Sequence, residues 1–121
     1  MRNVLLMTLL AALAVGCDLL SPEKSRSVEL HGQILDAQTR APIAGASWGV
    51  SNSCGFGTLT TLAQGQADAQ GRFVAHYEYP ICGDPSLIVS AVDRGYKVAR
   101  RQIYGRGLVT IPPTLLEKQE P

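Results

Sequence analysis

Apolar and polar positions alternate with a period of two in several parts of this chain. In residues 28–35 and 72–79 one face of the segment is apolar and the other is mostly polar. This period is typical of a β-strand with one buried face. Residues 87–92 form a continuous apolar run instead, as expected of a central strand. These segments predict strands, and no stretch after the first 27 residues shows helical periodicity.

Shorter segments predict further strands, separated by turns rich in Gly, Pro and Asp. The further strands are expected at residues 46–52, 58–67 with a kink at Gly65, 96–103 and 108–111. Residues 68–71 predict a tight turn, because Asp opens it and Gly tolerates positive φ. About seven short strands predict an all-β sandwich. We expect one domain over residues 28–113 and a flexible tail over residues 114–121.

The first residues carry the pattern of an export signal. Arg2 supplies a positive start, and residues 4–15 are apolar apart from Thr8. Because a bilayer-spanning helix needs about 20 apolar residues, this run is too short to cross a membrane. It fits a secretory signal peptide over residues 1–16.

The residues around the expected cleavage point resemble a lipobox, the processing site of bacterial lipoproteins. Leu13-Ala14-Val15-Gly16 precedes Cys17, with Gly and Cys on either side of the cleaved bond. We expect Cys17 to carry a thioether-linked diacylglycerol and an acyl chain such as palmitate on its freed amine. Two or three acyl chains hold a protein firmly on a membrane, whereas one holds it marginally. The alternative is an ordinary cleaved signal peptide in which Cys17 is incidental.

Residues 17–27 are predicted to form the lipidated cysteine and a tether, because they are polar, contain Pro22 and have no periodicity. Ten residues reach at most about 35 Å, so the domain would stay close to the membrane. We expect a lipid-anchored protein of the bacterial cell envelope, on the periplasmic face of the inner or outer membrane. Asp18 resembles the inner-membrane retention signal of enterobacterial lipoproteins and slightly favours the inner membrane.

Two cysteines remain if Cys17 carries lipid. An exported protein meets an oxidising compartment, so we expect Cys54 and Cys82 to form a disulfide. Closing a loop of roughly 30 residues would stabilise the fold by about 3–4 kcal/mol in the chain-entropy model. A metal pair or a reactive thiol is the alternative. No further Cys or His lies at ligand spacing, so no metal site is predicted.

Charge gives little indication of a ligand. The formal net charge is +1, and a nearly neutral protein is not expected to bind nucleic acid. His31 and His76 lie on the polar faces of predicted strands and are expected to be solvated surface residues. We predict no catalytic residues and no cofactor. One basic stretch could dock anionic lipid or an acidic partner, or could simply be a solvated strand: Arg94, Lys97, Arg100, Arg101 and Arg106.

Three motifs in order resemble those of carboxypeptidase regulatory-like domains. They are Gly32-Gln33-Ile34-Leu35-Asp36 with Thr39, Pro42-Ile43 and Gly45-Ala46; then Ala67-Asp68-Ala69-Gln70-Gly71-Arg72-Phe73; then Gly95-Tyr96. Arg40 departs from the family's Gly and Ala67 from its Thr. The resemblance implies a transthyretin-like Greek-key sandwich of seven or eight strands. It also implies a module that is usually non-catalytic, although a shared fold does not establish function.

Three functional hypotheses follow. The first is a lipid-anchored, non-catalytic envelope module that presents edge strands and loops to a protein partner. The second is an accessory lipoprotein of a secretion apparatus. The third is a small hydrolase or ligand carrier, which would need a deep pocket with converging polar groups.

Overall fold

The computed structural model describes residues 25–54, 59–80 and 83–120, and this part of the chain is almost entirely β-structure. A short 3-10 turn, η1 (Val92–Arg94), lies between the fifth and sixth strands. The strands are β1 (Ser25–Asp36), β2 (Ser47–Ser53), β3 (Leu59–Gln66), β4 (Arg72–Pro80), β5 (Ser86–Ser90), β6 (Ala99–Gln102), β7 (Gly107–Thr110) and β8 (Thr114–Leu116).

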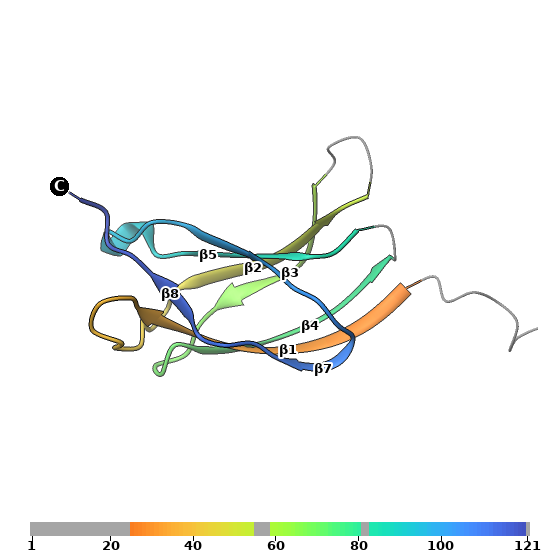
Figure 1. Ribbon diagram of the computed structural model, residues 1–121, viewed down its shortest axis with the longest axis horizontal. Helices are drawn as coiled ribbons and strands as arrows, with labels where there is room; N and C mark the ends of the chain where they lie inside the picture. Colours follow the sequence, from red (N-terminus) through yellow and green to blue (C-terminus); the bar gives the residue numbers. More distant parts are fainter. Residues whose placement is uncertain (1–24, 55–58, 81–82, 121) are drawn as a thin grey trace, which may run out of the picture.

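The strands form two sheets that lie in two layers (Figure 1). One sheet has the order β4-β1-β7, with β8 also paired to β1, and the other has the order β3-β2-β5-β6. β1 runs antiparallel to β4 and parallel to both β7 and β8. The predicted all-β sandwich is therefore confirmed.

β1 shows how the alternating pattern builds the core. Val28, Leu30 and Ile34 are almost fully buried between the sheets, while Glu29, His31 and Gln33 face outward. β4 alternates in the same way across nine residues. Burying one face of each strand removes apolar area from water, which is the main favourable term in folding.

An aromatic pair fills the space between the two sheets. Phe73 of β4 and Trp48 of β2 stack with ring centroids 5.0 Å apart. The Phe73 ring occupies the place that a Cβ would take on Gly32, its direct partner in β1. On the other side, a Cβ on Gly65 would lie 2.8 Å from Cζ2 of Trp48. Each sheet thus contributes a glycine that lets the rings sit close to the backbone.

Gly65 therefore does not mark the predicted kink in residues 58–67. The irregularity in the β2–β3 pairing lies elsewhere, since Val50 pairs with Ala63 and Ser51 with Thr61, which leaves Leu62 unpaired. A strand glycine can mark either a bend or a close packing contact, and Gly65 is a close packing contact with the Trp48 ring.

The predicted boundary of the tether was wrong by three residues. β1 begins at Ser25, which pairs with Pro80 at the end of β4, so Ser25–Ser27 belong to the sheet. These residues are polar and lack the alternating pattern. They are ordered as a strand because β4 offers backbone partners along its whole length.

The predicted flexible tail was also wrong in its first half. Thr114–Leu116 form β8 beside the end of β1, and the side chains of Thr114 and Leu116 are buried. Lys118 forms a bridge with Tyr96 further on. Pro112 and Pro113 interrupt the ladder after β7 because proline lacks an N–H. The chain then returns to the same edge of β1.

The predicted strand over residues 96–103 is shorter in the structure. Only Ala99–Gln102 pair with β5, and β5 itself ends at Ser90. Residues Val92–Arg94 form η1, which Gly95 ends with φ of 80°. The turn over residues 68–71 is confirmed, since Asp68 Oδ1 accepts hydrogen bonds from the Gln70 and Arg72 amides at 2.9 and 2.8 Å.

Candidate functional site

The three cysteines occupy different places relative to the described structure. Cys17 and Cys82 lie outside the described residues. Cys54 follows β2, and its Sγ accepts a hydrogen bond from Asn52 Nδ2 at 3.6 Å. The chain next to Cys82 approaches the chain next to Cys54, since a Cβ built on Gly83 would lie 2.8 Å from the Ser53 carbonyl oxygen. The Cys54–Cys82 disulfide stays a prediction, one with which this approach is compatible.

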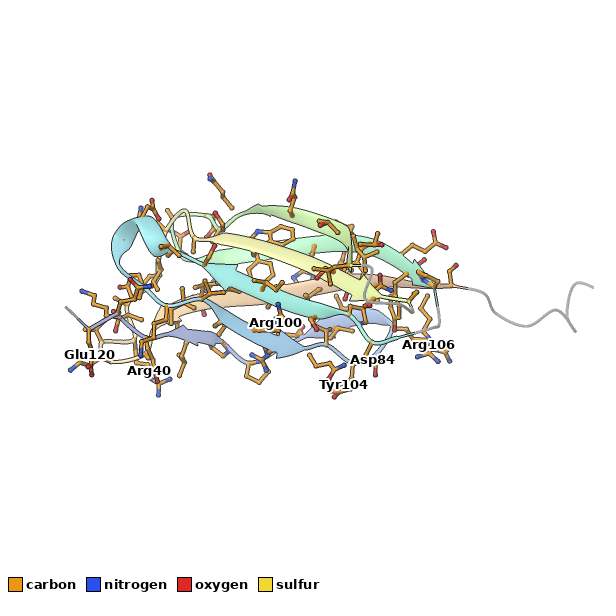
Figure 2. All side chains as sticks on the ribbon, turned by 90° about the horizontal axis from the view of Figure 1, so that it is seen from above. Arg40, Asp84, Arg100, Tyr104, Arg106 and Glu120 are labelled. Atoms are coloured by element: carbon orange, nitrogen blue, oxygen red, sulfur yellow. The ribbon has the colours of Figure 1, made fainter. Side chains whose placement is uncertain are left out.

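The basic residues of the predicted partner surface are spread along the molecule. Arg94 lies near Gly45, at the end of the sandwich that also carries Arg40. Figure 2 shows Arg100 near the middle and Arg106 toward the opposite end. Arg94, Arg100 and Arg106 are exposed. They do not gather into one compact patch, because β6 and the connection after it run along the length of the sandwich.

Arg101 has a structural contact that sequence reasoning missed. Its Nη1 donates to the Pro112 carbonyl oxygen at 2.9 Å and to Thr114 Oγ1 at 3.5 Å. These bonds join β6, at the edge of one sheet, to the start of β8 in the other. Arg101 thus helps to close the sandwich along this side. The position of Arg101 in a predicted strand does not indicate that its side chain bonds to the other sheet.

The two histidines meet at one carboxylate on the outer face of β1 and β4. Glu29 Oε2 lies 3.0 Å from His31 Nε2, and Glu29 Oε1 lies 3.6 Å from His76 Nδ1. All three side chains are substantially exposed, as predicted for the histidines. Exposed ion pairs of this kind contribute little to stability. In the described part of the chain, no group of three or more His, Cys, Asp or Glu is arranged to hold a metal ion.

A buried carboxylate at the end of β1 was also missed. Asp36 Oδ1 accepts hydrogen bonds from the amides of Gln38 and Thr39, at 2.8 and 2.9 Å. Asp36 Oδ2 accepts a hydrogen bond from the Tyr96 hydroxyl at 2.8 Å. The Thr39 amide, then the Tyr96 hydroxyl and the Gln38 amide, lower the pKa of Asp36 to about 2. The bond to Asp36 raises the pKa of Tyr96 in turn.

This pair joins two motifs that lie far apart in the sequence. Asp36 belongs to the first turn motif and Tyr96 to the Gly95-Tyr96 turn. The signal that could have revealed the contact is the joint presence of an Asp-x-x-Thr turn and a Gly-Tyr turn. The arrangement ties the start of the β1–β2 connection to η1, so its role is structural.

Two of the open grooves on the outer faces of the sheets lie over the middle strands β2 and β1. One, of about 260 Å³, runs along β2 between β3 and β5, over Gly49 and Ser51. The other, of about 410 Å³, lies over β1 beside His31 and Gln33. Neither has the enclosed shape with converging polar groups that a hydrolase or carrier site would need.

In the described part of the chain, no helix is long and apolar enough to span a bilayer.

Comparison with known proteins gives structural similarity only. No protein-family model matches the chain, and no curated protein matches it. The shaft pilin SpaA from Lactobacillus rhamnosus GG, solved as a double mutant, superposes with a TM-score of 0.52. The match has 9% identity and covers 79% of this chain and 52% of that one. It shows the fold, a β-sandwich.

Two further solved structures have lower TM-scores. The minor pilin GBS52 from Streptococcus agalactiae has a TM-score of 0.42 and 14% identity, over 81% of this chain and 46% of that one. A 9R-lipoxygenase from Cyanothece PCC8801 has a TM-score of 0.44 and 23% identity, over 77% of this chain and 17% of that one. The chain thus spans about half or less of the proteins it resembles. The resemblance to carboxypeptidase regulatory-like domains is supported only as far as a shared β-sandwich.

Proposed function

We propose that this protein is a lipid-anchored, non-catalytic module of the bacterial cell envelope that presents its β-sandwich to a protein partner. The observation that carries the proposal is the N-terminal pattern: Arg2, an apolar run, and Leu13-Ala14-Val15-Gly16 directly before Cys17. The module would stand on the periplasmic face of the inner or outer membrane.

The start of β1 supports a short connection to the membrane. With β1 beginning at Ser25, only residues 18–24 separate the anchor at Cys17 from the sheet. The eight steps along the chain from Cys17 to Ser25 extend to at most about 28 Å, so the domain would stay beside the lipid surface. A partner would then be met at a defined height above the membrane.

The sheet edges and end loops are the surfaces offered to a partner. β3 and β6 are the outer strands of one sheet, and β4 lies at an edge of the other. Outer strands carry backbone groups that a second chain can pair with. The loops after β2 and β4 would be joined by the proposed Cys54–Cys82 disulfide, which would hold their contact surface in one shape.

The anchor is tested by producing the full chain in a diderm bacterium with labelled palmitate. The processed protein should gain the mass of a diacylglycerol and acyl chain and should sediment with membranes. The Cys17→Ser variant should lose label and membrane association together. An unlipidated wild-type protein would overturn the anchor.

The partner is tested by crosslinking in intact envelopes, followed by purification of the wild-type and Cys17→Ser proteins. A defined protein that is recovered with the wild type and lost with Cys17→Ser supports a module whose position matters. Recovery of no defined protein with either form would overturn the partner-presenting role.

A further inference from the structure

Exposed large apolar side chains occur at both ends of the sandwich, and the two most exposed of them in the described chain, Leu108 and Tyr104, lie toward the same end. Among the large apolar residues of the described chain, Leu108, Tyr104 and Leu59 are the most exposed, at 69%, 66% and 60%. Scattered surface apolar residues need no explanation, but a group of them marks a contact surface. Their position in the fold is therefore informative.

Strand pairing places Leu108 at the end of the molecule where β1 begins. Gly107 pairs with Val28, and Leu108 pairs with Glu29, in the first half of β1. Leu59 opens β3 opposite Ser53, the last residue of β2. β2 ends where β5 begins, since Ser51 pairs with Ser86, so Leu59 lies at this same end.

Tyr104 lies in the connection that crosses this end from one sheet to the other. β6 ends at Gln102, opposite Ser86, and β7 begins at Gly107. Figure 2 shows Tyr104 and Arg106 toward this end, whereas Arg40 and Glu120 lie at the opposite one. The connection therefore lies toward the end of the sandwich at which β1 begins, at Ser25.

The crossing connection has a defined shape. Gly105 and Gly107 have φ of 110° and 72°, values that only glycine adopts at low cost. The Tyr79 hydroxyl donates to the Gly105 carbonyl oxygen at 3.4 Å, and the Ile103 amide donates to the Pro85 carbonyl oxygen at 2.9 Å. These contacts hold the backbone while Tyr104 and Leu108 project into solvent.

We propose that this end of the sandwich, through Tyr104 and Leu108 with Arg106 between them in the sequence, rests in the headgroup region of the lipid bilayer. The proposal depends on the lipid anchor of the proposed function. Tyr suits a membrane interface because its ring is apolar and its hydroxyl is polar. Arg can reach phosphates while its stem lies on apolar groups.

The short tether determines which surface meets the bilayer. An anchor attached at most about 28 Å before Ser25 brings the β1-start end to the membrane first. Charge at this end is mixed, since Arg26 and Arg106 are accompanied by Glu78 and Asp84. We therefore expect apolar insertion to dominate, with only weak dependence on anionic lipid.

The test uses the lipidated full protein in vesicles of phosphatidylethanolamine and phosphatidylglycerol that contain brominated acyl chains. Tyr104→Trp adds an indole at the proposed contact, and Val98→Trp adds one at the other end of the sandwich. Val98 is a matched control because it is 57% exposed. The indole added by Tyr104→Trp should be quenched at least twofold more strongly than that added by Val98→Trp. Equal quenching, or none for Tyr104→Trp, would overturn the proposal.

A second variant tests Leu108 without adding a probe there. Leu108→Ser in the Tyr104→Trp background should reduce the quenching at least twofold, and Val98→Ser should leave it unchanged. Far-UV circular dichroism reports whether each variant is folded. Unchanged quenching in a folded Leu108→Ser protein would count against the contact.

Failure of the anchor can be separated from failure of this contact. Intact mass shows whether Cys17 is lipidated before the protein is placed in vesicles. Were it unlipidated, the same processed protein would be sedimented with the same vesicles, where Tyr104→Ser with Leu108→Ser should bind at least threefold less than wild type. Equal binding of the two would overturn the contact independently of the anchor.

Discussion

Asp36 ends β1 and holds two turns together through its side chain. Its two carboxylate oxygens accept bonds from the Gln38 amide, the Thr39 amide and the Tyr96 hydroxyl. All three donors favour the charged form of the carboxyl group. Burial opposes it, and the low pKa of Asp36 shows that the hydrogen bonds prevail.

Stability should fall in acid because of Asp36. Its pKa is about 2 in the folded protein, against 3.8 ordinarily, so the carboxylate stabilises the fold fully above about pH 4. This contribution is lost as the pH falls through the folded pKa. Thermal denaturation from pH 5 to 2 should therefore show a falling Tm, with a shallower fall for Asp36→Asn.

The Tyr96 hydroxyl should account for part of this pKa shift. Tyr96→Phe removes the bond to Asp36 Oδ2, so the pKa of Asp36 should rise toward its ordinary value. An NMR titration of the Asp36 carboxyl carbon measures the change. Tyr104→Phe is the control, because its hydroxyl bonds only to Gln102 among the bonds described. An unchanged Asp36 pKa in Tyr96→Phe would contradict the assigned cause.

Arg40 adopts a conformation that suits glycine. Its φ is 64°, and among the described residues it alone combines positive φ with a side chain. Arg40→Gly should relieve this strain and stabilise the protein by about 0.5–1 kcal/mol, after the extra unfolded-state entropy of glycine is subtracted. Urea denaturation measures the effect. Gln38→Gly should instead destabilise the protein, and a loss of stability in Arg40→Gly would contradict the prediction.

At the scale of single elements, β8 shows how a short segment can be ordered by its neighbours. It has three residues, and isolated strands of this length have no stability of their own. β8 lies parallel to the end of β1, and Arg101 holds its first residue. Leu116 is fully buried in the core. The segment thus completes one side of the sandwich.

Truncating Leu116 should lower the free energy of unfolding by an amount typical of a buried core residue. Leu116→Ala removes fully buried apolar atoms and leaves a cavity, so we expect a loss of about 2–4 kcal/mol. Glu117→Ala changes the next, exposed residue and should alter stability by less than about 0.5 kcal/mol. Chemical denaturation of both variants measures this. Equal stability of the two would mean that β8 does not pack in solution as described.

At the scale of the whole molecule, the two sheets are joined through the Phe73–Trp48 pair. The pair depends on missing Cβ atoms at Gly32 and Gly65. The sheets meet again along one side, where Arg101 of β6 bonds to the chain before β8. Changes at these places should affect the whole sandwich, because interiors are close-packed and tolerate little added volume.

Gly32→Ala should destabilise the sandwich by about 2 kcal/mol or more, because the new methyl would overlap the Phe73 ring. Gly49→Ala is the matched control, since its new methyl would have only the Ala63 carbonyl oxygen within 4 Å, at 3.9 Å. It should be neutral or slightly stabilising. Thermal and urea denaturation compare the two. A Gly32→Ala protein as stable as Gly49→Ala would show that the core can repack.

The proposed disulfide should stabilise the whole domain. Cys54→Ser with Cys82→Ser should lower the free energy of unfolding by about 3 kcal/mol in the chain-entropy model. Reduction of the wild type should have a similar effect. Thiol titration of the exported protein provides the direct measurement, and two reactive thiols would argue against the pairing.

Features that depend on neighbouring residues could be predicted from the order of amino acids. Period-two alternation placed β1 and β4 and assigned their buried faces, and Asp68 with Gly71 specified a tight turn. These features are local, since the pleat alternates side chains and a turn needs particular φ values. The N-terminal pattern likewise predicts an anchor at Cys17.

Features that depend on residues distant in the sequence became visible in the folded protein. The tertiary structure brought Ser25–Ser27 and Thr114–Leu116 into the sheet beside β4 and β1, although neither segment shows a strand pattern. It joined Asp36 to Tyr96 and spread the basic residues along the molecule. It also gathered Tyr104 and Leu108 at the end where β1 begins. A segment gains backbone hydrogen bonds and burial from the strand that lies beside it. The residues of the segment do not indicate which strand that is.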